Sequence, residues 1–92
     1  MPVQVNIPAP LRPVAGNRGR LEVEAGTVDE LLQELVRRYP EMAEKLLDGT
    51  GALRRHVNLY ANDEDIRFLQ GPRTALHDGD VVSIVPAIAG GH

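Results

Sequence analysis

Hydrophobic and polar residues alternate in three parts of the chain, and each alternation predicts a β-strand with one buried face. The first alternation joins Val3, Val5 and Ile7, the second covers residues 21–25, and the third covers residues 57–61. A long loop rich in proline and glycine separates the first two segments. We therefore expect these two strands to form an antiparallel hairpin with an irregular tip.

Residues 28–39 have the spacing of an amphipathic α-helix. The apolar positions recur at intervals of three and four: Val28, Leu31, Leu32, Leu35, Val36 and Tyr39. Thr27 and Glu30 have the spacing of a capping box at the start of the helix, and Pro40 ends it. We expect this to be the main helix of the protein, with its leucines in the core.

The remaining segments predict shorter or less regular elements. Residues 41–47 favour a second short helix, and residues 66–69 favour a short strand that returns after a turn at residues 62–65. Residues 81–88 are apolar on both faces, which is typical of a central strand covered on at least one side. Pro86 limits hydrogen bonding near the end of that strand.

The order of these elements predicts an α+β protein. A hairpin is followed by one good helix and then by further strands, which favours a β-grasp, or ubiquitin-like, roll. We expect a mixed sheet of four to five strands, with the first and last strands as its central pair and one main helix across one face. Residues 1–87 would form this domain, and residues 88–92 would form a flexible C-terminal tail that ends Gly-Gly-His.

The amino-acid composition argues against several classes of function. The 92-residue chain is long enough for one compact domain, and its net charge of −3 gives no basic excess for binding nucleic acid. No apolar run approaches the about 18 residues of a membrane span, and the first residues lack the pattern of a signal peptide. We therefore expect a cytoplasmic protein that binds neither nucleic acid nor membrane. The absence of cysteine excludes side-chain thiol chemistry.

The side chains do not form a recognisable active site. His56, His77 and His92 lack the spacing of a metal motif, and the acidic residues 63–65 lack that of a calcium loop. Ser83 has no nearby base in the sequence, so a hydrolase triad is unsupported. We expect no catalytic residue, no bound metal and no bound cofactor, and hence a protein that is not itself an enzyme.

The C-terminal residues Ile88, Ala89, Gly90, Gly91 and His92 offer a different kind of chemistry. Extended at about 3.3–3.6 Å per residue, residues 87–92 reach about 20 Å and can deliver a main-chain carboxylate into another enzyme. Glycine suits this role because it has no Cβ, which lets catalytic groups approach its carbonyl. Adenylation would turn the carboxylate into a mixed anhydride, from which a sulfur nucleophile can displace AMP. The alternative interpretation is a frayed terminus.

Three stretches of the sequence resemble the ubiquitin-like sulfur carrier proteins of the MoaD/ThiS superfamily. They are residues 3–8 with residues 11–13, residues 57–68 and residues 78–91. The Gly-Gly pair alone is weak, but the Asp-Gly-Asp turn, the apolar strand and the Pro-Ala-Ile-Ala-Gly-Gly ending are together fairly specific. The resemblance covers essentially the whole chain and is strongest to the CysO-type carriers of cysteine biosynthesis.

The resemblance implies both a reaction and its partners. The carboxyl of Gly91 would be adenylated by a ubiquitin-activating-type adenylyltransferase that uses ATP, and would then become a thiocarboxylate. In the CysO-like branch, the sulfur passes to a pyridoxal-phosphate-dependent cysteine synthase, and a JAMM-type zinc metalloprotease releases the product. A MoaD-like small subunit would instead serve the large subunit of molybdopterin synthase. A ubiquitin-like modifier conjugated to lysines is the third alternative.

One residue departs from the pattern of the family. A carrier active as written would end at Gly91, so His92 must be removed by a protease or be a vector-derived residue. Gly90 would give the tail its freedom, while Ile88 and Ala89 would thread a partner's channel or simply continue the strand.

Three apolar residues form a candidate docking face. They are Ile66, Phe68 and Leu69, and membership of the core is the alternative for them.

Overall fold

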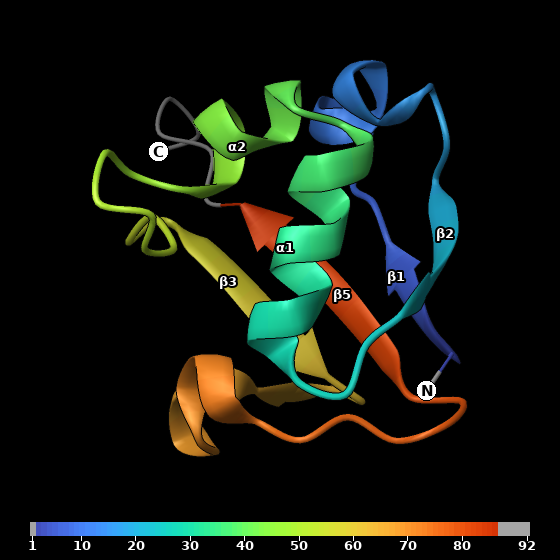
Figure 1. The fold of residues 1–92 in the computed structure, drawn as a ribbon, viewed down its shortest axis with the longest axis vertical. Helices are drawn as coiled ribbons and strands as arrows, with labels where there is room; N and C mark the ends of the chain where they lie inside the picture. The colour runs from blue at the N-terminus through green and yellow to red at the C-terminus, as the bar shows by residue number, and fades with distance from the viewer. Residues whose placement is uncertain (1, 87–92) are drawn as a thin grey trace.

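Five strands form one mixed sheet in the computed structural model, which describes residues 2–86 (Figure 1). The strands are β1 (Pro2–Asn6), β2 (Arg20–Glu24), β3 (Val57–Ala61), β4 (Glu64–Asp65) and β5 (Val81–Pro86). Their order across the sheet is β2-β1-β5-β3-β4, and only β1 and β5 run parallel among these pairs. The predicted hairpin and the predicted pairing of the first and last strands are therefore confirmed.

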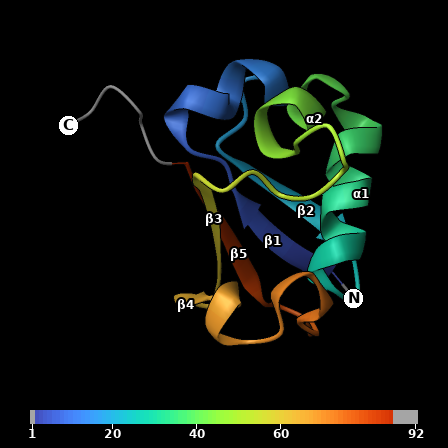
Figure 2. The ribbon, with the colours of Figure 1, turned by 90° about the vertical axis from the view of Figure 1, so that its left-hand side faces the viewer.

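Two α-helices lie on the same side of this sheet (Figures 1 and 2). They are α1 (Val28–Arg38) and α2 (Glu41–Leu46), and three 3-10 segments accompany them: η1 (Ala9–Ala15), η2 (Ile66–Phe68) and η3 (Gly71–Arg73). One long helix packed across a mixed sheet whose central strands are parallel is the β-grasp arrangement. The predicted α+β class is confirmed.

The core lies between α1 and the inner face of the sheet. Val5, Leu59 and Val82 point inward from the three middle strands, and Leu31 and Leu35 face them from α1; all five are fully buried. Burial alternates along the strands because successive side chains point to opposite faces. One face of β5 is covered, as predicted for a strand covered on at least one side, and Val85 on the other face is 43% exposed.

The start of α1 has the predicted capping box. The Thr27 hydroxyl accepts a hydrogen bond from the Glu30 N–H at 3.1 Å, and the Glu30 carboxylate accepts one from the Gly26 N–H at 2.8 Å. The first bond satisfies an N–H group that the first turn of a helix leaves without a partner, and the second ties the residue before the N-cap to the same turn. The helix ends at Arg38, before the predicted stop at Pro40.

Two sequence-based expectations were wrong. The proline-rich loop is not irregular, because residues 9–15 form η1 and bury Leu11 and Ala15 against the core. Proline fixes φ near the helical value, which makes it compatible with a short 3-10 turn. Residues 66–69 do not form a strand, because the Asp65 carboxylate accepts a hydrogen bond from the Arg67 N–H at 2.9 Å and starts η2 there.

Two linked turns fix where β5 begins. The turn between β3 and β4 has Asn62 and Asp63 at φ values of 50° and 74°, the positive values that a two-residue hairpin turn requires. The Asn62 amide donates to the Asp80 carboxylate at 2.9 Å, and its carbonyl accepts from the Val81 N–H at 3.0 Å. Gly79, at a φ of 84°, donates to the Pro2 carbonyl at 2.9 Å. The Asp-Gly-Asp sequence therefore sets the register of the strand that leads to the tail.

Candidate functional site

The candidate site begins where β5 ends. Pro86 is the last described residue of this strand and pairs with Val57 of β3, while Val85 pairs with Asn58. On its other side β5 pairs with β1 through Ser83. The last two described residues of β5 are therefore held by β3, because the pairing with β1 ends at Ser83.

The predicted tail residues lie outside the described part of the chain. These residues are Ile88, Ala89, Gly90, Gly91 and His92. The thiocarboxylate position, the tail and the processing site therefore stay predictions, and the geometry that bears on them is that of the residues around Pro86.

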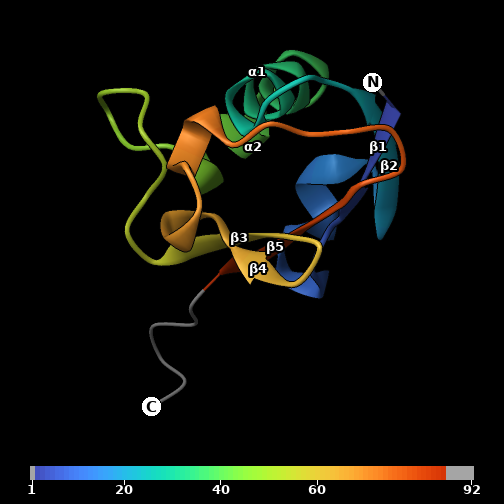
Figure 3. The ribbon, with the colours of Figure 1, turned by 90° about the horizontal axis from the view of Figure 1, so that it is seen from below.

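The sheet has two chemically different ends. We call the end where β1 and β5 finish, and where β2 and β3 begin, the tail end. We call the opposite end the turn end, because it carries the turn at Asn62 and Asp63 and the turn at residues 77–80; Figure 3 views the molecule from this side. The segments η1 and α2 lie at the tail end, whereas η2 and η3 lie at the turn end (Figure 1).

Exposed arginines lie around the tail end. Arg12, Arg18 and Arg20 come from η1 and the start of β2, and Arg55 precedes β3. The Arg12 guanidinium donates to the Ile7 carbonyl at 3.1 Å. A shallow surface groove brings Arg12 and Arg20 beside Ile84 of β5. Cationic side chains therefore lie close to the end of β5, the strand that leads to the tail.

The turn end is acidic and internally hydrogen-bonded. The Asn62 amide, and next the His77 N–H, hold the pKa of Asp80 below its usual range. Arg67 does the same for the pKa of Asp65, whose side chain also caps η2. In both cases hydrogen bonds favour the charged form of the carboxyl group. These carboxylates therefore help to hold the turns in place.

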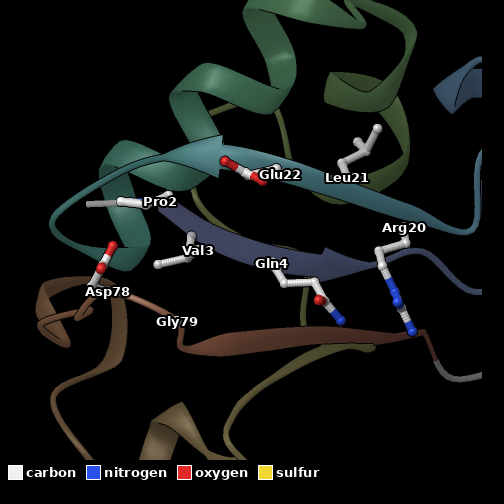
Figure 4. A pocket seen from close by; sticks show the side chains of 8 residues that line it. All are labelled: Pro2, Val3, Gln4, Arg20, Leu21, Glu22, Asp78 and Gly79. Atoms are coloured by element: carbon white, nitrogen blue, oxygen red, sulfur yellow. The ribbon is translucent and has the colours of Figure 1, made fainter.

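Figure 4 shows the two ends along the outer face of the hairpin. An open hollow of about 460 Å³ is lined there by residues from β1, β2 and the turn before β5: Pro2, Val3, Gln4, Arg20, Leu21, Glu22, Asp78 and Gly79. Arg20 lies at one end of the hollow, and Asp78 lies at the other. The charge thus changes sign along the length of the sheet.

The three residues of the candidate docking face are separated by the fold. Ile66 is only 3% exposed and belongs to the core, whereas Phe68 is 86% exposed and Leu69 is 39% exposed. The segment that carries them lies at the turn end, away from Pro86 (Figures 1 and 2). The structure leaves two of the three at the surface, and their docking role stays a prediction.

Sequence reasoning did not single out Val85. Its side chain is apolar, 43% exposed and next to Pro86, so it lies at the surface beside the last described residue of β5. The run of apolar residues on both faces of the strand was the available signal, but it was used only to predict a central strand.

An apolar groove of about 550 Å³ lies between α1 and the segment before β3. Its apolar lining residues are Val28, Leu32, Ala52, Leu53, Val57, Ile66 and Pro72. It contains no group of acids or histidines that could act on a substrate.

The described side chains offer no catalytic constellation. Ser83 accepts a hydrogen bond from the Asn6 amide at 3.3 Å, and no histidine contacts it within residues 2–86. His77 lies 3.6 Å from the Asp80 carboxylate, on the surface. In the same part of the chain, no three histidines or acids come close enough together to hold a metal ion. Nor does any helix there have the length and apolar character needed to cross a membrane.

Comparison with known proteins shows the family to which the chain belongs. The model of the ThiS family matches residues 5–91. The chain belongs to the ThiS family. The sulfur carrier protein CysO of Mycobacterium tuberculosis is 43% identical over 93 residues, which cover 99% of this chain and 100% of that protein. The small archaeal modifier protein 3 of Haloferax volcanii is 35% identical over 94 residues, which cover 99% and 100% of the two chains.

Solved structures support the same relationship. The crystal structure of the Amycolatopsis orientalis BexX/CysO complex matches with a TM-score of 0.88 and 37% identity, covering 97% of this chain and 99% of that chain. This ThiS-family chain is therefore similar, over almost its whole length, to sulfur carrier proteins and to a modifier protein. The sequence-based recognition of the superfamily is confirmed.

Proposed function

We propose that the chain is a sulfur carrier, not an enzyme, and that its reactive group is the C-terminal carboxyl of Gly91 after removal of His92. The observation that carries this proposal is the similarity to sulfur carrier proteins over 99% of the chain. The strand β5 supports it, because its pairing with β1 as far as Ser83 and with β3 as far as Pro86 gives the following residues a fixed starting point.

The proposed chemistry takes place in the active sites of partner enzymes. The Gly91 carboxylate attacks the α-phosphorus of ATP, which releases pyrophosphate and leaves an acyl adenylate. A hydrosulfide ion then attacks the acyl carbon and displaces AMP, and loss of its proton leaves the sulfur as a thiocarboxylate. Gly90, Ala89 and Ile88 serve as the narrow part of the chain that enters the partner. The carrier itself holds no cofactor, since ATP is used by the activating enzyme.

The proposed partners follow from these steps. An adenylyltransferase of the ubiquitin-activating type loads the carrier in the cytoplasm, where ATP is present. A pyridoxal-phosphate-dependent cysteine synthase accepts the sulfur. A JAMM-type zinc metalloprotease removes His92 from the precursor and also releases the finished cysteine from the carrier. The exposed pair Phe68 and Leu69 is a proposed contact for a partner that binds away from the tail end, while Ile66 contributes to the core.

Intact-mass measurement of the untagged protein from its native host tests the proposal. We expect a species that has lost His92 and is heavier than the chain ending at Gly91 by the difference between one sulfur and one oxygen atom. A Gly91→Ala variant is the control for the position of loading. If sulfur-replete cells contain only the unprocessed chain, the proposal is wrong.

A second candidate function has its own support. The similarity to small archaeal modifier protein 3 favours attachment of Gly91 to lysine side chains through an isopeptide bond. High-mass conjugates that disappear in the Gly91→Ala variant would favour this function. Similarly, a stable complex with the large subunit of molybdopterin synthase would favour the MoaD-like alternative.

A further inference from the structure

Charged side chains within residues 2–86 are distributed unevenly between the two ends of the sheet. The cations at the tail end are Arg12, Arg18, Arg20, Arg37, Arg38, Lys45, Arg54 and Arg55, and the anions Glu34, Glu41, Glu44 and Asp48 lie at the same end. The anions at the turn end are Glu24, Asp29, Glu30, Asp63, Glu64, Asp65, Asp78 and Asp80, and the cations Arg67 and Arg73 lie at that end. The overall charge of −3 therefore combines an excess of cations at the tail end with an excess of anions at the turn end.

Arginines flank the start of the tail on both sides. On one side, Arg55 lies two residues before Val57, which pairs with Pro86. On the other side, Arg20 opens β2 and shares the surface groove with Arg12 and Ile84. The strand order of the sheet places these cations around one point, although they are far apart in the sequence.

These flanking arginines are not neutralised within the described part of the chain. Among residues 2–86, no carboxylate lies within ion-pair distance of Arg12, Arg20 or Arg55. By contrast, Arg37 and Arg38 both pair with Glu34. A guanidinium stays protonated at physiological pH, so the flanking groups are permanent positive charges.

We propose that the tail end is an electrostatic docking surface for a protein partner that carries carboxylates around the mouth of its tail channel. This inference rests on the proposed function, in which the tail must enter an enzyme before its carboxyl can react. An encounter is productive only when the tail end faces the partner. Attraction at this end and repulsion at the acidic turn end both favour that orientation, and such steering raises association rates by about 10- to 1,000-fold.

The observations favour a protein partner over a nucleic acid. A nucleic-acid surface usually combines a basic excess with exposed aromatic side chains. Here the net charge is −3, and the aromatic side chain with 86% exposure, Phe68, lies at the turn end. A local set of arginines on an acidic molecule instead fits a complementary local set of carboxylates.

The test compares charge reversal at the two ends. The chain ending at Gly91 is mixed with ATP and the adenylyltransferase of its own organism, and pyrophosphate release gives kcat/KM at several ionic strengths. The variants are R20E, R55E and R20E/R55E. The matched control is R73E, which makes the same charge change at an exposed arginine of η3, at the turn end. Circular dichroism checks that each variant is folded.

We expect R20E/R55E to lower kcat/KM by roughly tenfold or more at low ionic strength, through KM and not through kcat. The loss should shrink as salt is raised, because salt screens charges beyond about 10 Å at 0.1 M ionic strength. The control R73E should stay within about twofold of the unmodified chain, since its charge lies away from the tail.

Four results would overturn the inference. Equal losses in R20E/R55E and R73E would mean that only net charge matters, and rates independent of salt would exclude steering. Unchanged adenylation in R20E/R55E, with lost binding of a single-stranded RNA oligonucleotide, would assign the arginines to nucleic acid. If the unmodified chain released no pyrophosphate, the proposed function itself would fail and the inference with it. That result is distinguishable from normal adenylation in both the unmodified chain and R20E/R55E, which would contradict the inference alone.

Discussion

The polar and charged side chains at the turn end and at the tail end of the sheet have different roles. At the turn end, Asn62, Asp65 and Asp80 direct their polar atoms inward to backbone N–H groups and neighbouring side chains. At the tail end, Arg20 and Arg55 remain exposed and have no carboxylate partner in the described part of the chain. Polar groups that are satisfied internally stabilise a fold, whereas unpaired charges remain available for a partner.

The comparison predicts that stability is most sensitive at the core and the turn end, and that function is most sensitive beyond the tail end. Removing residues 90–92 should abolish adenylation and leave the free energy of unfolding unchanged. The reason is that the reactive carboxyl is lost, whereas the described core is complete within residues 2–86. Pyrophosphate release and urea unfolding of the same samples measure the two effects. A truncated chain that still supported adenylation would place the reactive group elsewhere.

Ile66→Ala should give the largest loss of stability at the turn end. Its side chain is 3% exposed, so the truncation leaves a cavity beneath η2 and costs about 2–5 kcal/mol. The free energy of unfolding, measured in urea, checks this. A change below about 0.5 kcal/mol, the usual size for a surface substitution, would show that Ile66 is not part of the core.

Asn62→Ala should lose both side-chain hydrogen bonds that join the two turns. At about 0.5–1.5 kcal/mol for each bond, with a further about 1 kcal/mol for a positive φ, we expect a loss of about 2–4 kcal/mol. Asn62→Gly is the matched control, because it removes the same bonds and accepts the positive φ. It should therefore cost about 1 kcal/mol less than Asn62→Ala. Equal losses would mean that the backbone at this turn is unstrained.

The stabilisation from Asp80 should depend on pH. Because the pKa of Asp80 is lower in the folded than in the unfolded chain, its charged form stabilises the fold above the unfolded pKa of about 3.9. That contribution is lost as the pH falls through the folded pKa. The difference in unfolding free energy between the unmodified chain and Asp80→Asn should therefore be largest near neutral pH and shrink in acid. Asp78→Asn, at an exposed neighbour, controls for the change in net charge.

Sequence patterns predicted the elements whose signals are local and repeated. The alternation in β1, β2 and β3 and the helical spacing in α1 each recur several times, and the structure has all four. The short run at residues 66–69 carried no such repetition. A single hydrogen bond from the Arg67 N–H to Asp65 decided its conformation, and an apolar run of four residues does not reveal that bond.

Only part of the candidate site could be predicted from the sequence. The Gly-Gly ending identified the reactive group as a hypothesis, because its chemistry depends on a local sequence. The arginines around Pro86 could not be grouped in that way. Arg20 and Arg55 lie at the same end, on either side of β1 and β5, because these two strands lie between β2 and β3. This strand order is a property of the whole sheet.

Phe68→Ala should have the smallest effect and tests whether the two ends are functionally separate. Phe68 is 86% exposed, so its truncation should change the free energy of unfolding by less than about 0.5 kcal/mol. Because its segment lies at the turn end, we expect adenylation to be unchanged. The counterpart is Val85→Ala, which truncates an exposed apolar side chain next to Pro86 and should raise KM for the adenylyltransferase. If Phe68→Ala raised KM more than Val85→Ala, the activating enzyme would bind the turn end. The proposed division of roles between the two ends would then be wrong.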